Sequence, residues 1–294
     1  MKLVLGTAQL GEDYGTAFPG KKITQSTFIK ILDIAKKNNI YNIDTAAAYG
    51  DSLSILGKIS VEEMLVISKL PKIPDTLFKK DINLWLSTTL EKMLDELKLK
   101  NIDILLIHGS GDLTGKFSNE LVNFLHKIKL NNFVKKIGVS IYDPEEINSF
   151  YHFFTPDVIQ CPYNVFDQRI LSSGWLDKLV TKKIEVHARS IFLQGVLLKD
   201  ILELDSYFLK WEDEFIRFEN YCNLYKISKL EAAIAFVKSE PRIKKILIGV
   251  QGEGHLKEII NAYNEPIKNI FLGSCEDINL INPLNWKILG QKFR

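Results

Sequence analysis

Short apolar runs alternate with longer amphipathic segments along most of the chain. Most of the runs are continuously apolar, which is typical of strands that are covered on both faces of a sheet. Eight strands are predicted, and they span Lys2–Leu5, Tyr41–Ile43, Leu65–Ser68, Ile102–Ile107, Lys136–Val139, Asp157–Gln160, Glu185–Ala188 and Lys244–Ile248.

The segments between the strands place apolar residues on one stripe of a helix. Ser118 stands at the start of one such stripe and is a residue type that caps helix N-termini. The predicted helices include Ser26–Asn38, Trp85–Leu97, Ser118–Leu130, Asp205–Leu224 and Lys229–Ser239.

Alternation of strands and helices requires a parallel sheet with the helices outside it. Eight repeats without a break in composition favour a closed (β/α)8 TIM barrel over a doubly wound sheet, so we expect residues 1–294 to form one α/β domain. The connection between Ala188 and Lys244 is enlarged, and this loop after the seventh strand is expected over the barrel mouth. Residues after about Phe271 lack periodicity and are expected to form a C-terminal tail outside the barrel.

The composition argues against nucleic-acid and membrane partners. The 38 basic and 36 acidic residues give a formal net charge of only +2. No apolar run approaches the roughly 18–20 residues of a membrane span. Cys161, Cys222 and Cys275 are odd in number and far apart, so neither a disulfide framework nor a metal site is expected. The first residues lack the design of a signal peptide, and a cytoplasmic location is expected.

Four polar residues are candidates for chemistry. Asp44, Lys69 and His108 each close an apolar run, and Tyr49 follows Asp44 closely. Because parallel strands end at the same mouth of a barrel, we expect the four side chains to meet there. Taken singly, Asp44 would suit a helix N-cap, Tyr49 would suit a packing position, and Lys69 would suit a solvated strand end. His108 taken singly fits a structural role and a catalytic role equally well.

Together the four side chains suit the reduction of a carbonyl group. A lysine ammonium favours the phenolate of a nearby tyrosine and lowers the tyrosine pKa from ~10, which eases proton delivery. A carboxylate keeps the lysine charged and aimed, and a histidine can donate a hydrogen bond where negative charge develops on the carbonyl oxygen. Since no side chain supplies hydride, a nicotinamide cofactor is implied.

Seven segments of the chain resemble, in order, the signatures of the aldo-keto reductase family. They extend from Leu3 to about Asn264 and read LGTAQLG, IDTAAAYG, ISKL, IDILLIHG, KKIGVS, PDVIQCPYN and ARSIFLQGVLL. The resemblance implies a (β/α)8 barrel that binds NADPH. It also implies Tyr49 as the catalytic proton donor, assisted by Asp44, Lys69 and His108.

The resemblance further implies the cofactor site. Ser140 and Gln160 match the partners of the carboxamide, although Ile141 replaces an asparagine that is common there. Arg189 replaces the tyrosine that stacks on the nicotinamide, and a planar guanidinium can also stack. The resemblance implies NADPH, and NADH is the alternative because His255 stands where an arginine often meets the 2′-phosphate. The implied cofactor-binding residues are Gly6, Thr7, Asp44, Ser140, Gln160, Arg189, Ser190, Gln194, Gly195, Gly249 and His255.

The sequence thus predicts an NAD(P)H-dependent oxidoreductase that acts on a small carbonyl substrate in either direction. LGTAQLG, ARSIFLQG and NPLNW resemble a bacterial branch of the family that is associated with sugar and surface-polysaccharide metabolism. One alternative is a catalytically weak regulatory protein of the same family that senses the cofactor. Another is a metal-dependent barrel hydrolase, which the shortage of His and Asp at the other strand ends disfavours. A monomer or weak oligomer is expected.

Overall fold

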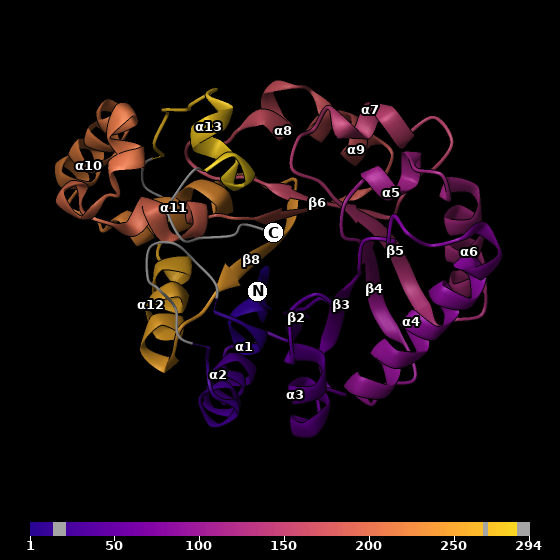
Figure 1. The fold of residues 1–294 in the computed structure, drawn as a ribbon. Coiled ribbons are helices and arrows are strands. Elements are labelled where there is room, and N and C mark those ends of the chain that lie inside the picture. Colours follow the sequence, from indigo (N-terminus) through magenta and orange to yellow (C-terminus); the bar gives the residue numbers. More distant parts are fainter. Residues whose placement is uncertain (14–21, 267–269, 287–294) are drawn as a thin grey trace.

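The protein is a closed barrel of eight parallel strands that follow one another in chain order (Figure 1). The computed structural model describes residues 1–13, 22–266 and 270–286. All eight predicted strands are present, so the prediction of a (β/α)8 barrel is confirmed. The strands are β1 (Leu3–Gly6), β2 (Asn42–Asp44), β3 (Leu65–Leu70), β4 (Ile102–Ile107), β5 (Val134–Ser140), β6 (Val158–Pro162), β7 (Glu185–Arg189) and β8 (Ile243–Gly249).

Helices surround the barrel, as Figure 1 shows. The α-helices are α1 (Ala8–Gly11), α2 (Gln25–Lys37), α3 (Ser52–Ile59), α4 (Ile82–Leu97), α5 (Gly111–Thr114), α6 (Ser118–Leu130), α7 (Glu146–Phe150), α8 (Arg169–Ser172), α9 (Trp175–Thr181), α10 (Glu212–Tyr225), α11 (Lys229–Ser239), α12 (Glu253–Asn264) and α13 (Ile278–Ile281). Short 3₁₀ helices lie at Lys79–Asp81, Leu193–Leu198, Ile201–Glu203, Ser206–Trp211 and Pro283–Asn285.

One predicted helix and one predicted helix cap differ from the structure. The predicted helix Asp205–Leu224 is broken, because a 3₁₀ helix at Ser206–Trp211 precedes α10. The side chain of Asp205 accepts a hydrogen bond from the backbone N–H of Tyr207, which caps the 3₁₀ turn instead of an α-helix. The helix Ser118–Leu130 is observed as α6 with its predicted bounds, but Ser118 is its first residue and not its N-cap, which is Phe117.

Part of the barrel interior is filled by apolar side chains. Side chains of Val4, Ile67, Ile104, Leu106 and Val158 form one cluster inside the barrel. The alternate side chains of the same strands belong to a second, larger cluster that includes the helices. This alternation is the ordinary period of a strand, and it decides which residues point into the mouth where each strand ends.

The enlarged loop after β7 and the tail pack on each other. Trp211 Nε1 donates a hydrogen bond to Asp277 Oδ2 at 2.9 Å, and Tyr207 Oη donates one to the carbonyl of Asn279 at 2.9 Å. The rings of Phe208 and Trp286 meet edge to face with centroids 4.8 Å apart. The tail, as far as residue 286, therefore lies outside the barrel, as the sequence predicted.

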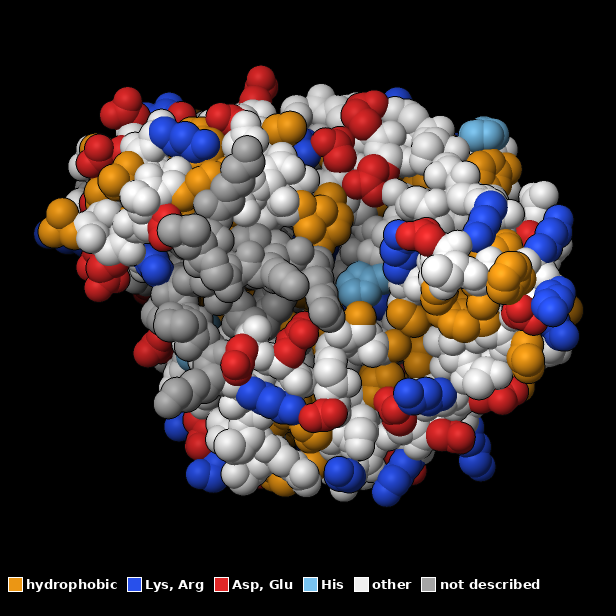
Figure 2. Space-filling model, in the orientation of Figure 1, with side chains coloured by type: hydrophobic (Ala, Val, Ile, Leu, Met, Phe, Trp, Pro, Cys, Tyr) orange, Lys and Arg blue, Asp and Glu red, His pale blue; other side chains and the backbone are white. Residues whose placement is uncertain are grey.

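On the face shown in Figure 2, neither acidic nor basic side chains predominate. Acidic and basic side chains are interspersed there, with hydrophobic side chains between them. In the described part of the chain, no helix is long and apolar enough to cross a membrane. Nor do three or more His, Cys, Asp or Glu side chains gather to hold a metal ion within residues 1–13, 22–266 and 270–286.

Candidate active site

The four candidate catalytic residues meet at the carboxyl ends of the strands. Lys69 lies two residues beyond the interior residue Ile67 on β3, and His108 two beyond Leu106 on β4. The period of a strand therefore turns both side chains toward the barrel axis at the mouth. Asp44 ends β2, and Tyr49 follows in the loop before α3.

Asp44 and Lys69 form a buried ion pair. Lys69 Nζ donates to Asp44 Oδ1, and the two side chains are only 2% and 3% exposed. Lys69 Nζ also donates to the carbonyl oxygen of Thr45 at 3.1 Å. Gln160 Nε2 donates to the second carboxylate oxygen, Asp44 Oδ2, at 2.8 Å. Both carboxylate oxygens are thus satisfied, and the ammonium is held in one position.

Tyr49 and His108 complete the cluster. Lys69 Nζ lies 5.0 Å from the centroid of the Tyr49 ring. The rings of Tyr49 and His108 meet edge to face, with centroids 5.8 Å apart. The structure therefore brings together all four residues that the sequence singled out, from three strand ends and one loop.

The pKa of Tyr49 is raised, which is the reverse of the direction that the sequence suggested. Burial contributes most, and the negative charge of Asp44 adds to it, while the positive charge of Arg189 opposes it. The ammonium of Lys69 is paired with Asp44, so its positive field at the phenol is largely cancelled by the carboxylate beside it. Tyr49 is therefore a neutral phenol that holds its proton.

His108 is neutral as well. Burial, followed by the positive charges of Lys69 and Arg189, lowers the pKa of His108 to about 3. A neutral imidazole has one N–H donor and one acceptor nitrogen. It can therefore donate a hydrogen bond to an oxygen at the mouth without carrying charge.

Ser140 and Gln160 lie side by side, because they are paired in register on β5 and β6. Both are buried. The amide nitrogen of Gln160 is bonded to Asp44, whereas its oxygen, Oε1, is buried and has no hydrogen-bond partner among the described residues. Such an orphaned acceptor is costly unless a ligand or a water molecule satisfies it. A carboxamide N–H2 group has the chemistry to do so.

Arg189 is held on one wall of the mouth. Its guanidinium stacks on the ring of Tyr142, with Cζ 4.2 Å from the centroid. One terminal nitrogen donates to the carbonyl oxygen of Ile141 at 2.9 Å, and the other donates to Ser190 Oγ at 3.1 Å. One face of the guanidinium is therefore occupied by Tyr142, and only the opposite face can stack on a cofactor ring.

The loop after β7 has an unusual backbone. Ser190, Leu193, Gln194 and Gly195 all have positive φ, at 55°, 47°, 56° and 88°. Non-glycine residues rarely adopt this conformation, and clusters of such strain occur at ligand-binding loops. The loop is pinned where Asn164 Nδ2 donates to the carbonyl oxygen of Ser190 at 3.0 Å.

Glycines at the end of β8 leave space next to the backbone. A side-chain carbon placed on Gly249, Gly252 or Gly254 would meet no other atom within 4 Å. Gly252 is the N-cap of α12 and Gly254 lies in its first turn, and a helix N-terminus favours anionic groups. The backbone there leaves room for a ligand with phosphates to approach closely.

His255, in the first turn of α12, is neutral in this setting. Its Nδ1 accepts a hydrogen bond from the backbone N–H of Gln251 at 3.4 Å, and burial lowers its pKa below 6.5. The side chain is thus a weaker cation than an arginine would be at this position.

Gly6 and Thr7 have roles within the protein itself. A side chain on Gly6 would come within 3.2 Å of the carbonyl oxygen of Ile248, so the glycine permits close pairing of β1 with β8. The hydroxyl of Thr7 donates to the carbonyl oxygen of Asp44 at 3.1 Å and accepts from Ser52 Oγ at 2.8 Å. Thr7 is buried, so these contacts tie β1 to β2 and α3.

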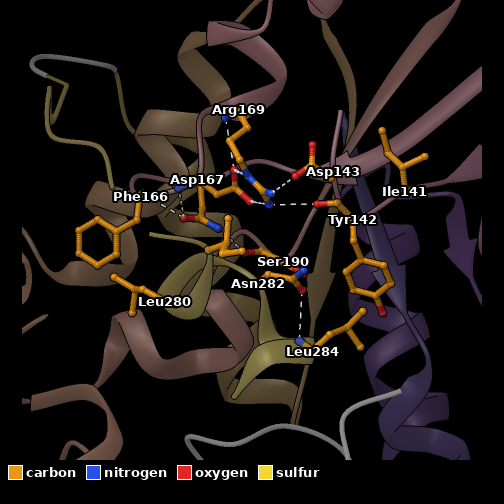
Figure 3. Close-up of polar contacts among 12 residues, drawn as sticks. Ile141, Tyr142, Asp143, Phe166, Asp167, Arg169, Ser190, Leu280, Asn282 and Leu284 are labelled. Atoms are coloured by element: carbon orange, nitrogen blue, oxygen red, sulfur yellow. Dashed lines mark hydrogen bonds and ion pairs between the residues drawn. The ribbon is translucent and has the colours of Figure 1, made fainter. Parts of the chain in front are cut away.

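The sequence reasoning missed a second network behind the mouth, shown in Figure 3. Arg169 forms ion pairs with Asp143 at 2.7 Å and with Asp167 at 2.8 Å, and it donates to the carbonyl oxygen of Tyr142 at 3.0 Å. It thereby joins the loop after β5 to the loop after β6 and fixes the backbone of Tyr142, on which Arg189 stacks. None of these residues ends an apolar run, so the pattern that found the other four residues gave no signal here.

A neutral phenol beside a buried ion pair, at the open end of a parallel barrel, can deliver a proton to an oxygen on which negative charge develops, which is the chemistry that an oxidoreductase acting on carbonyl groups needs. Within that class the family can be stated. The family model of the aldo/keto reductases matches residues 2–280, and the chain belongs to the aldo/keto reductase family.

Solved structures agree with the family in fold. The aldo-keto reductase AKR11C1 from Bacillus halodurans, in its holo form, has 15% sequence identity and a TM-score of 0.71, with 91% of this chain and 88% of that chain covered. A Pseudomonas aeruginosa protein described as a putative aldo-keto reductase has 18% identity and a TM-score of 0.65, with 89% of each chain covered. A search of curated proteins found no match.

Proposed function

We propose that this chain is an NAD(P)H-dependent oxidoreductase that reduces an aldehyde or ketone to the alcohol and also catalyses the reverse reaction. The observation that carries the proposal is the buried Asp44–Lys69 ion pair beside the ring of Tyr49. Buried ion pairs contribute little net stability compared with apolar residues of similar size, so a pair at this position suggests chemistry. We further propose that residues 1–294 form a single domain.

Tyr49 is the proposed proton donor. Its raised pKa keeps the phenol protonated until negative charge develops on the carbonyl oxygen, which then takes the proton. Neutral His108 donates a hydrogen bond to the same oxygen and orients the substrate. Lys69, held by Asp44, fixes the position of the phenol. The nicotinamide coenzyme, when bound, supplies the hydride.

The coenzyme would lie along the carboxyl ends of β5 to β8. Gln160 Oε1 and Ser140 would bind the carboxamide, since the first lacks a partner within the described ranges and the second is its neighbour in register. Ser190, Gln194 and Gly195 would hold the pyrophosphate in the positive-φ loop. The adenosine end would lie at the open backbone around Gly249 and against His255.

A small carbonyl compound of sugar type is the substrate class that we propose, on the resemblance of the LGTAQLG and ARSIFLQG segments to the polysaccharide-linked branch. The test is a screen of aldoses and small aldehydes with NADPH and with NADH. Coenzyme oxidation that depends on an added carbonyl compound supports the proposal. Binding without turnover would instead indicate the cofactor-sensing protein, and activity that a chelator abolishes would indicate the metal hydrolase.

The preference for the 2′-phosphate is expected to depend on pH through His255. Only the protonated imidazole attracts the phosphate, and burial lowers the pKa of His255 below 6.5. The ratio of the NAD⁺ dissociation constant to that of NADP⁺ should therefore be flat between about pH 7 and 8.5 and rise below about pH 6.5. Titration of the acid-stable oxidised coenzymes, followed by tryptophan fluorescence, measures the ratio.

The matched control is His255→Gln, which keeps a hydrogen-bonding side chain that does not titrate. The ratio in this variant should lack the rise below about pH 6.5 and should follow only the titration of the 2′-phosphate itself, whose pKa is about 6. A strong preference for NADP⁺ that is equally large at pH 5.5 and 8.5 in the native protein would show that a permanently charged Lys or Arg binds the phosphate instead.

A further inference from the structure

Arg189 differs from the other cations near the reaction centre in the charge that surrounds it. Lys69 is paired with Asp44, and Arg169 is paired with Asp143 and Asp167. Arg189 forms no ion pair within the described ranges, and its hydrogen-bond acceptors there are a carbonyl and a hydroxyl. Its positive charge is therefore not cancelled by a carboxylate in contact with it.

The guanidinium is also held in place before any ligand binds. It stacks on Tyr142, whose carbonyl oxygen is in turn bonded to Arg169, and it donates hydrogen bonds to two neighbouring loops. These contacts hold the positive charge in one position at the mouth, where a second positive charge would meet it.

The charge acts on the reaction centre itself. The positive charge of Arg189 opposes the rise in the pKa of Tyr49 and contributes to the low pKa of His108. The guanidinium therefore lies within electrostatic reach of both residues, on the wall where the family resemblance expects the nicotinamide to stack.

We propose that Arg189 makes the site select the oxidation state of its coenzyme, so that reduced nicotinamide coenzyme binds more tightly than the oxidised form. The oxidised ring carries a positive charge that the reduced ring lacks, and a fixed guanidinium repels it. The tyrosine that Arg189 replaces would have the opposite effect, because the face of an aromatic ring attracts a cation. The inference rests on the proposed function. Weaker binding of the oxidised coenzyme favours its rapid release after each turnover, so carbonyl reduction is the preferred direction.

The test compares the dissociation constants of NADP⁺ and NADPH by tryptophan fluorescence in the native protein and in three variants. The two coenzymes differ only in the nicotinamide ring, so the ratio of the two constants isolates its charge. Arg189→Gln should lower the ratio (NADP⁺ over NADPH) on the order of tenfold. Arg189→Lys keeps a positive charge and should retain most of the ratio, whereas Arg189→Tyr should lower it further.

A merely structural role for Arg189 predicts a different result. Loss of the contact with Tyr142 would then weaken the binding of both coenzymes equally in all three variants and leave the ratio unchanged. That outcome would overturn the inference while leaving the proposed function intact. If the native protein binds neither coenzyme, the proposed function itself is wrong.

Discussion

Replacing Tyr49 with phenylalanine is expected to lower turnover with an aldehyde substrate by roughly 10²–10⁴-fold, the usual contribution of a positioned acid. The ring and its contacts with His108 and Lys69 remain, so the dissociation constant for NADPH should stay near its native value. Steady-state kinetics and a coenzyme titration on the same preparation measure the two effects separately.

Tyr163→Phe provides the matched control, since it removes the hydroxyl of another buried tyrosine, whose ring packs on Phe236 instead of the four-residue cluster. Its turnover should be close to native. Near-native turnover in Tyr49→Phe would mean that another group supplies the proton, and the roles assigned here would have to be redistributed.

Breaking the Asp44–Lys69 pair is expected to cost both stability and activity. Lys69→Met leaves a buried carboxylate without its cation, and such a loss typically costs about 3–5 kcal/mol of unfolding free energy. Asp44→Asn leaves the buried ammonium in the same situation. Both changes disturb the surroundings of Tyr49, so turnover should fall as well, more strongly in Lys69→Met. Urea denaturation measures the stabilities.

The double variant Lys69→Met/Asp44→Asn separates the pair from its members. It should be more stable than the sum of the two single losses predicts, by about 0.5–3 kcal/mol, because no unpaired charge remains. Lys72→Met serves as a surface control. It removes an exposed ion pair with Asp75 and should change the stability by less than about 1 kcal/mol. Strictly additive losses at Asp44 and Lys69 would contradict a shared interaction.

Much of the fold follows from local pattern. Strands that are buried on both faces consist of apolar residues throughout, so β4 was predicted with its observed bounds and the others to within a few residues. Helix starts were less predictable. The break at Trp211 within the predicted helix Asp205–Leu224 depends on packing against the tail, which no local pattern reports.

The site was predictable only in part, for a physical reason. Asp44, Lys69 and His108 end their strands, and the parallel barrel alone brings them together. The direction of the Tyr49 pKa was not predictable, because it depends on burial and on the pairing of Lys69 with Asp44 in three dimensions. The stack of Arg189 on Tyr142, and the link through Arg169, join residues from different loops and leave no periodic trace in the sequence.

Transfer of deuterium from the coenzyme tests the central proposal most directly. The protein would be incubated with an aldehyde substrate and NADPH that carries deuterium at the transferable position of nicotinamide C4. Because the reaction moves hydride to the carbonyl carbon while Tyr49 supplies the proton to oxygen, the alcohol should carry one deuterium on carbon, and Tyr49→Phe should slow its appearance. An alcohol without deuterium, or no alcohol with any aldehyde tested, would contradict the proposed reaction.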